Sequence, residues 1–219
     1  MRTCISIFAF ATVLAMAQDQ PDFVRERIEI TEPPRDADGF STERAKICAT
    51  LASGNKQCYT APAGFYNQGK VTFVGLPESK NGLVFFINSH NAFGGFQTSL
   101  ALLVPGPKES LRNLLARNTA YSERGEFEFW QDKSISPWPV LSIADYVWGR
   151  DESRNDQHYY EIRTLLLDAR SGQYTLRDHF QTRAKYATPS LDDRDRVLDS
   201  EKTNLIAHLE RTIRQASGK

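Results

Sequence analysis

The sequence has no excess of charge of either sign. Lysine and arginine together number 27 among its 219 residues, and aspartate and glutamate also number 27. Proteins that bind nucleic acid through their overall field carry an excess of positive charge, often gathered on one face. The balance therefore argues against a nucleic-acid partner, and we expect none.

The sequence also has no apolar stretch long enough to cross a membrane. Arg2 precedes the apolar run 5–16, and a small-x-small pattern ends at Ala17. A spanning helix needs roughly 20 apolar residues, whereas this shorter pattern is typical of a secretory signal peptide. We expect cleavage near Ala17, which leaves a secreted or periplasmic chain without an integral membrane span.

Cysteine is scarce, with three residues in all, and Cys4 falls inside the predicted signal peptide. The remaining pair, Cys48 and Cys58, enters an oxidising compartment, where thiols pair. They flank a turn-forming Gly54 between two short strand-like stretches. The sequence therefore predicts a disulfide between them. A redox pair or a metal site is the alternative, but the spacing lacks the two-residue gap typical of both.

The middle of the chain lacks the alternation of strands and helices that builds a parallel nucleotide-binding sheet. Short apolar runs separated by Gly, Pro, Asn and Asp instead predict a mainly β fold. We expect an antiparallel sandwich or barrel of about 7 to 9 strands with a C-terminal helix. Beyond the cysteine hairpin, the predicted strands are 70–76, 83–89, 98–104, 125–131, 140–148, 158–168 and 173–182.

Patterns within these strands predict how they are covered. LVFFI and SLALLV are continuously apolar, which is typical of strands buried on both faces. In the last strand Tyr174, Leu176 and Phe180 alternate with polar residues, which predicts a sheet with one buried and one solvated face. The stretch SLRNLLARN near Leu111 fits a helical turn and a short strand equally well.

We divide the chain into a signal peptide (1–17), a flexible leader (18–42), a β-rich domain (43–188) and a charged linker with a helix (189–219). Within the leader, VRERIEI alternates apolar and charged residues, so an added edge strand is an alternative there.

The last segment has a helical apolar stripe, and Asp199 or Ser200 is its expected cap. His208 lies beside the stripe without a visible partner. The helix either packs on its own domain or pairs with another chain. The stripe consists of Leu198, Leu205, Leu209 and Ile213.

The strongest candidate for chemistry is the loop between the strands 140–148 and 158–168. Glu152, Asp156 and His158 are candidate catalytic residues, and with Asp151 they are candidate ligands of a divalent cation, because such loops bring carboxylates and imidazoles together. Their spacing matches neither an EF-hand nor a zinc-binding helix, and a solvated hairpin loop is the alternative. We expect no other cofactor.

Aromatic residues gather in the same region. Trp138, Tyr146 and Trp148 are candidate ligand-binding residues, because such side chains anchor contacts with sugars and peptides. A place in the core or at the edge of a strand is the alternative explanation for them.

Three hypotheses about function follow. No catalytic motif stands out, so we infer an exported, noncatalytic module that binds a protein, a glycan or an envelope component. One alternative is a hydrolase or lyase, with or without a metal, that uses the loop from Asp151 to His158. The other is an assembly protein that holds another subunit through its C-terminal helix.

Overall fold

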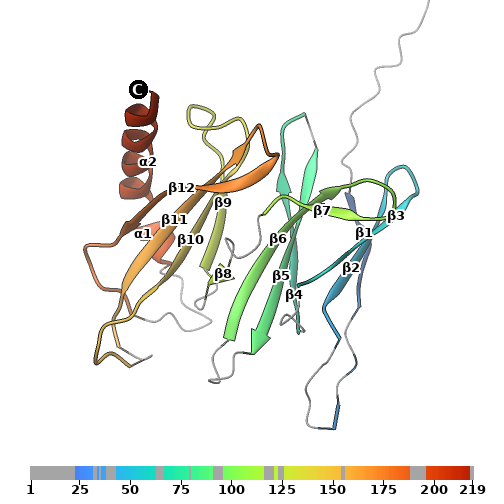
Figure 1. Ribbon diagram of the computed structural model, residues 1–219, viewed down its shortest axis with the longest axis horizontal. Coiled ribbons are helices and arrows are strands. Elements are labelled where there is room, and N and C mark those ends of the chain that lie inside the picture. Colours follow the sequence, from blue (N-terminus) through green and yellow to red (C-terminus); the bar gives the residue numbers. More distant parts are fainter. Residues whose placement is uncertain are drawn as a thin grey trace, which may run out of the picture.

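The protein is a stack of three antiparallel sheets with a helix on the outside (Figure 1). None of the sheets closes on itself, so the expected mainly β fold is confirmed and has the open, sandwich-like form. Residues 1–17 and the proposed cleavage site lie outside the part of the chain that this computed structural model describes. The described residues are 23–31, 34, 36–37, 43–62, 67–78, 80–90, 96–115, 121–122, 126–153, 156–187 and 196–217.

The first sheet contains β1 (Phe23–Thr31), β2 (Lys46–Leu51) and β3 (Lys56–Thr60) in that order. The alternating stretch of the expected leader is therefore an edge strand of the body. Its start is held by the side-chain amide of Asn81, which accepts from the Phe23 N–H and donates to the Phe23 carbonyl, each at 3.0 Å. This amide ties the first sheet to the second.

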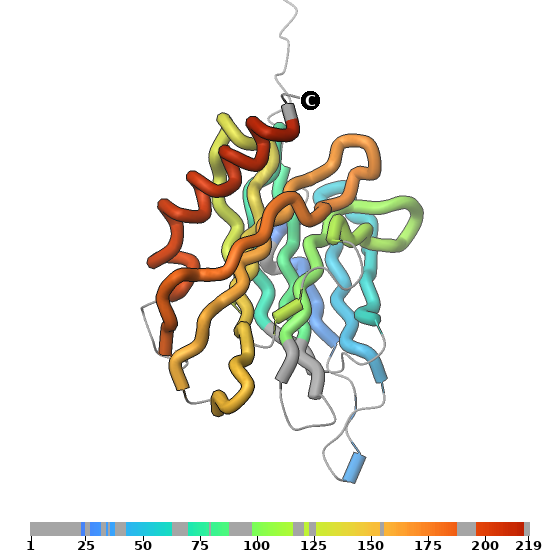
Figure 2. Tube along the Cα trace, turned by 60° about the vertical axis from the view of Figure 1, so that its left-hand side comes forward, coloured from blue at the N-terminus to red at the C-terminus, as the bar shows by residue number. Residues whose placement is uncertain are grey.

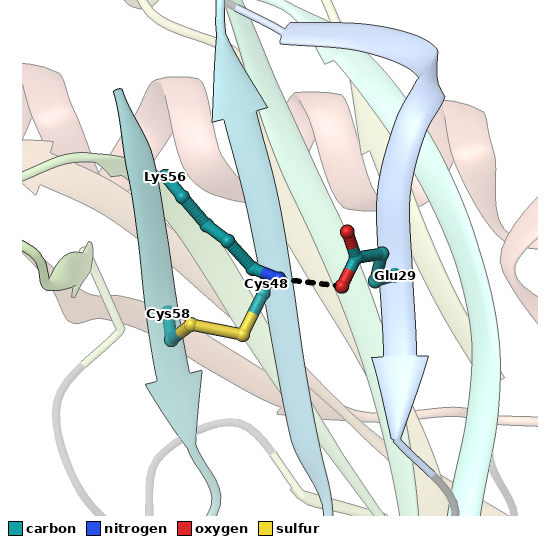
Figure 3. Close-up of a disulfide and its surroundings, with 4 residues drawn as sticks. All are labelled: Glu29, Cys48, Lys56 and Cys58. Atoms are coloured by element: carbon teal, nitrogen blue, oxygen red, sulfur yellow. Dashed lines mark hydrogen bonds and ion pairs between the residues drawn. A yellow bond between two sulfur atoms is a disulfide. The ribbon is translucent and has the colours of Figure 1, made fainter. Parts of the chain in front are cut away.

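The predicted disulfide between Cys48 and Cys58 is confirmed (Figure 3). The two cysteines are directly paired across β2 and β3, with Cα atoms 4.0 Å apart. The turn between the strands requires a glycine, because Gly54 has a φ of +87° that side chains rarely adopt. On the same face, Lys56 pairs with Glu29 at 2.6 Å across β2, but both are exposed, so the pair contributes little stability.

The second sheet has the order β4, β5, β6, β7, with β8 also paired to β6. The ambiguous stretch near Leu111 is a strand. The bounds are β4 Asn67–Gly75, β5 Asn81–His90, β6 Phe96–Pro105, β7 Leu111–Asn113 and β8 Tyr121–Ser122.

Strands β5 and β6 are covered on both faces, as their continuous apolar runs predict. Leu83 and Phe85 pack against the first sheet, whereas Val84 packs against the third. In β6, Leu103 likewise packs against the first sheet and Leu102 against the third. Burial of each such side chain favours folding by about 1.5–3 kcal/mol, so this sheet requires a layer on each side.

The third sheet has the order β12, β11, β10, β9. Its strands are β9 (Glu126–Trp130), β10 (Val140–Val147), β11 (Tyr159–Asp168) and β12 (Gln173–Gln181). Each of the seven strands predicted after the cysteine hairpin overlaps an observed strand of the second or third sheet.

The expectation of one buried and one solvated face in the last strand is wrong. Thr164 pairs with Asp178 but Leu165 pairs with Leu176, so Arg177 is an extra residue in β12. A bulge of this kind reverses which face the following side chains occupy.

Tyr174 therefore packs toward the second sheet and Phe180 toward the helix. Leu176, expected to point inward, is 52% exposed.

The C-terminal segment forms α1 (Val197–Ser200) and α2 (Lys202–Ser217), which lie across the outer face of the third sheet (Figure 2). The predicted stripe is confirmed: Leu198, Leu205 and Leu209 are buried there. The third sheet therefore covers the apolar stripe of the C-terminal segment. None of the described helices is long and apolar enough to cross a membrane.

The expected cap at Asp199 or Ser200 is wrong, because both lie inside α1 and Arg196 occupies the N-cap position without a side-chain bond. The Glu126 carboxylate of β9 instead accepts from the Leu198 N–H at 2.7 Å. A buried carboxylate at the positive end of a helix is favourable, so a distant strand supplies the group that local sequence does not.

Removing the disulfide should destabilise the protein without changing its fold. A loop of this size gives about 2–3 kcal/mol by chain entropy. We expect the double variant C48A/C58A to lower the free energy of unfolding in urea by that amount, with an unchanged far-ultraviolet circular dichroism spectrum. A loss under about 0.5 kcal/mol would show that the unfolded chain is already constrained there.

Candidate functional site

The candidate site lies at the open end of the β10–β11 hairpin. Strand β10 ends at Val147 and β11 begins at Tyr159. Beside β11, His158 and Tyr186 exchange two backbone hydrogen bonds of 2.9 and 2.8 Å. This bridge brings the segment after β12, with Lys185, against the hairpin loop. We call Tyr146, Trp148, Glu152, His158 and Lys185 the hairpin-end cluster.

The loop folds back on itself because Gly149 has no side chain. Its N–H donates to Glu152 Oε2 at 2.9 Å. A Cβ atom on Gly149 would lie 2.6 Å from Glu152 Cδ, which is closer than van der Waals contact allows. The glycine therefore leaves the space that the carboxylate occupies.

Glu152 is the hub of the cluster. Its Oε1 accepts from Lys185 Nζ at 2.5 Å, and its Oε2 lies 3.0 Å from His158 Nδ1. The hydrogen bond from Lys185, followed by the one from the Gly149 N–H, lowers the pKa of Glu152 to about 2. The carboxylate is thus ionised at every ordinary pH.

Its partner Lys185 has a raised pKa, chiefly through the same hydrogen bond. The two charged groups therefore stay paired over the whole neutral range.

His158 is completely buried. With Glu152 as a purely accepting partner, its Nδ1 carries the donated proton. Its Nε2 is buried and has no hydrogen-bond partner among the described residues. The rings of Tyr146 and Trp148 pack edge-to-face against the imidazole, with centroids 4.7 and 5.0 Å away. The imidazole is therefore a fixed support for the aromatic rings.

Trp148 is the part of the cluster that meets solvent. Its side chain is 48% exposed, although one edge packs against His158 and its ring centroid lies 5.3 Å from that of Tyr146. About half of this residue therefore remains accessible to solvent while the rest packs against its aromatic neighbours.

The structure brings together only some of the predicted site residues. Tyr146, Trp148, Glu152 and His158 meet in the hairpin-end cluster. Trp138 does not join them, because it packs against the core between the second and third sheets. The three candidate ligand-binding aromatics therefore do not form one surface.

The proposed cation ligands do not converge either. Asp156 accepts from the Ser153 N–H at 2.6 Å, which lowers its pKa and fixes the loop backbone. Asp151 is exposed. Among the described residues, no group of three or more histidine, cysteine, aspartate or glutamate side chains is arranged to hold a metal ion.

Sequence reasoning missed Lys185 and the role of Gly149. Lys185 is 33 positions from Glu152, and only the backbone bridge between His158 and Tyr186 explains why they meet. Gly149 had a local signal, because a glycine directly after a strand often marks a tight turn.

A second pair was also missed at the helix. His208 Nδ1 lies 2.6 Å from Asp178 Oδ2, and Thr212 donates to the other oxygen of the same carboxylate at 3.1 Å. The His208 ring also stacks on Phe180. These contacts fasten α2 to β12, so we assign them a structural role.

Comparisons with protein-family models, with curated proteins and with solved structures found no match to this chain.

Substitution of Gly149 by alanine should disrupt the hairpin-end cluster. The new Cβ displaces the Glu152 carboxylate, so we expect the pKa of Glu152 to rise from about 2 toward its ordinary 4.5. Carbon-detected NMR titration of the side-chain carboxyl measures this directly. Gly75→Ala is the matched control, because a Cβ there meets nothing within 4 Å. Equal pKa values in the two variants would contradict the proposed geometry.

Glu152 should also make stability depend on acidity. Its folded-state pKa is lowered, so the stabilisation is present above pH 4.5 and is lost as pH falls toward 2. We expect wild type to melt at a higher temperature than Glu152→Gln at pH 6, with a gap that closes near pH 2. The difference between the two proteins isolates Glu152 from other acidic residues with lowered pKa values, such as Asp132 and Asp168.

Lys185→Met tests the cause of the shift, because it removes the largest contribution. In that variant the loss of stability should begin at a higher pH than in wild type. A gap between wild type and Glu152→Gln that stays constant down to pH 2 would refute the assignment.

Proposed function

We propose that the protein is an exported, noncatalytic module that binds its ligand through Trp148 at the hairpin end. The observation that carries the proposal is that the half-exposed indole of Trp148 packs against the rings of Tyr146 and His158. A rigid aromatic side chain gives a large contact area and loses little conformational entropy on binding. Such residues are frequent at the centre of recognition surfaces.

The same contacts count against the hydrolase or lyase alternative. A general acid or base works best with a pKa near the operating pH and within reach of the substrate. Glu152 has a pKa of about 2, and both of its carboxylate oxygens accept hydrogen bonds from neighbouring groups. His158 is completely buried, and Asp156 is bound to the loop backbone. The candidate catalytic groups therefore support the loop.

The assembly alternative is also less favoured. It requires an apolar helix face that the chain's own domain leaves uncovered. Leu205 and Leu209 are instead buried against the third sheet, and Ile206 and Ile213 pack at the margin of the same cluster. The side of α2 away from the sheet carries exposed polar residues such as Arg211 and Arg214.

Export is supported by two features that do not depend on the site. The amino-terminal sequence has the pattern of a signal peptide, and the two cysteines outside it are joined. Structural disulfides persist in oxidising compartments and are rare in a reducing cytosol. The ligand is then a component of the envelope or of the surrounding medium.

The three tryptophans of the chain offer a direct test. We expect the indole N–H resonance of Trp148 to shift when nitrogen-15-labelled protein meets its ligand, while those of buried Trp130 and packed Trp138 stay in place. The probes are neutral hexasaccharides, defined decapeptides and phospholipid bicelles. The ligand should remain chemically unchanged after prolonged incubation.

Leu176→Ala is the matched control for Trp148→Ala, because Leu176 is a similarly exposed apolar side chain on the same sheet. Only the tryptophan variant should lose binding. Turnover of a bound probe, or the failure of every probe to shift Trp148, would overturn the proposal.

A further inference from the structure

We infer that two copies of this protein associate through strand β1, which pairs with β1 of the second copy in antiparallel orientation about a twofold axis at Ile28. The inference is independent of the proposed function, because β1 belongs to the first sheet and the hairpin end to the third. Three observations carry it: the open edge of β1, the direction of its backbone groups and the order of its charged side chains.

Strand β1 has an open edge. It lies at the end of the first sheet and, among the described residues, has β2 as its one neighbouring strand. The strand runs over Phe23–Thr31, and the Asn81 amide holds its first residue. An edge strand presents outward N–H and carbonyl groups with which a strand of another chain can pair.

The hydrogen bonds of the first sheet show which backbone groups of β1 face outward. The Cys58 N–H donates to the Glu109 carbonyl at 2.9 Å, on the side away from β2. The directly opposed Cys48 and Cys58 are therefore not a hydrogen-bonded pair. Backbone groups alternate in direction along an antiparallel strand, so those of Cys48 face its other neighbour, which is Glu29 of β1.

The residues on either side of Glu29 follow the opposite alternation, so the N–H and carbonyl groups of Ile28 and Ile30 face outward. The side chain of Ile28 packs on the core between the first two sheets, and Ile30 is paired with the buried Ile47. Ile30 nevertheless remains 36% exposed. The edge thus combines outward hydrogen-bonding groups with an incompletely covered apolar side chain.

The charged side chains of β1 select one register. Arg27 and Glu29 flank Ile28, and both are exposed. In an antiparallel pair centred on Ile28, Arg27 of each copy lies directly opposite Glu29 of the other. Opposite charges stabilise such a pair, whereas like charges destabilise it. The neighbouring registers that also pair the outward groups are centred on Arg27 or on Glu29, and each places like charges opposite one another.

Both charged side chains can take a second partner without giving up the first. Glu29 accepts from Lys56 through Oε2 at 2.6 Å (Figure 3), which leaves Oε1 for a guanidinium. Arg27 donates one of its five N–H groups to the Leu51 carbonyl at 3.4 Å. Charges on edge strands ordinarily deter association. Here their order is self-complementary, which identifies the partner as a second copy of this chain.

The pairing should be weak and should stop at two copies. One pair of edge strands covers less than the roughly 1,200 Å² at which stable interfaces begin, although Ile30 gains a diagonal contact with Ile28 of the second copy. A twofold pair occupies the edge of β1 in both copies, so the assembly is closed.

The test is sedimentation equilibrium of the mature protein from about 10 μM to about 1 mM, the range in which a weak dimer dissociates. The average mass should rise with concentration toward that of two copies. The amide resonances of Ile28 and Ile30 should shift over the same range in nitrogen-15-labelled protein. A monomer at the highest concentration, or growth beyond two copies, would overturn the inference.

Charge reversal tests the register. Glu29→Arg places arginines opposite each other, and Arg27→Glu places glutamates opposite each other, so each should weaken the dimer by at least about tenfold. The double variant R27E/E29R restores opposite charges between the copies and should recover an affinity within about threefold of wild type. Failure of the double variant to recover dimerisation would refute the register, because Lys56 has lost Glu29 in it as well.

Glu210→Arg is the matched control, because it makes the same change of charge and also removes an exposed ion pair, that with Arg214 on α2. It should dimerise as wild type does. Ile30→Pro removes an outward N–H that β2 does not use, so it should weaken the dimer while circular dichroism shows an unchanged fold. A dimer that persists unchanged in both Glu29→Arg and Ile30→Pro would place the contact elsewhere and overturn the inference.

Discussion

The architecture depends on one constraint, which is that strands β5 and β6 are apolar on both faces. Val84 and Phe85 are adjacent in the chain, point in opposite directions and are both buried. A sheet built from such strands requires a second layer on each side. The third sheet meets the same condition in turn, because Leu141 faces the second sheet and Val140 faces outward. The helix satisfies that last requirement.

Much of this was accessible from the sequence, because burial leaves a local pattern. The disulfide, seven strands and the helical stripe follow from composition and periodicity. The bulge at Arg177 was not accessible, since the sequence still alternates through it and only pairing with β11 shows the extra residue. The capping of α1 by Glu126 could not be predicted for the same reason, because Glu126 lies 72 residues before Leu198 in the sequence. Local rules cannot supply interactions set by tertiary contact.

The candidate site could likewise be predicted from the sequence only in part. The aromatic and acidic content of the loop after β10 marked the region, and Glu152 and His158 do meet at 3.0 Å. Which role they take was not visible, because it depends on Lys185, which the backbone bridge at Tyr186 brings beside them. Trp138 and Trp148 are both tryptophans, but Trp138 packs against the core between the second and third sheets. Composition therefore located the hairpin end, and packing decided which tryptophan is presented to solvent.

The proposed function requires that titratable residues lie near one another at the hairpin end without being catalytic. Catalysis requires a group that can change its protonation state near the working pH. The contacts of Glu152 do the opposite, since the ammonium of Lys185 and the N–H of Gly149 both stabilise the ionised form. A carboxylate held ionised is a good anchor for an imidazole, and an anchored imidazole is a good support for an indole. Each contact thus increases the rigidity of Trp148, as the proposed binding function requires.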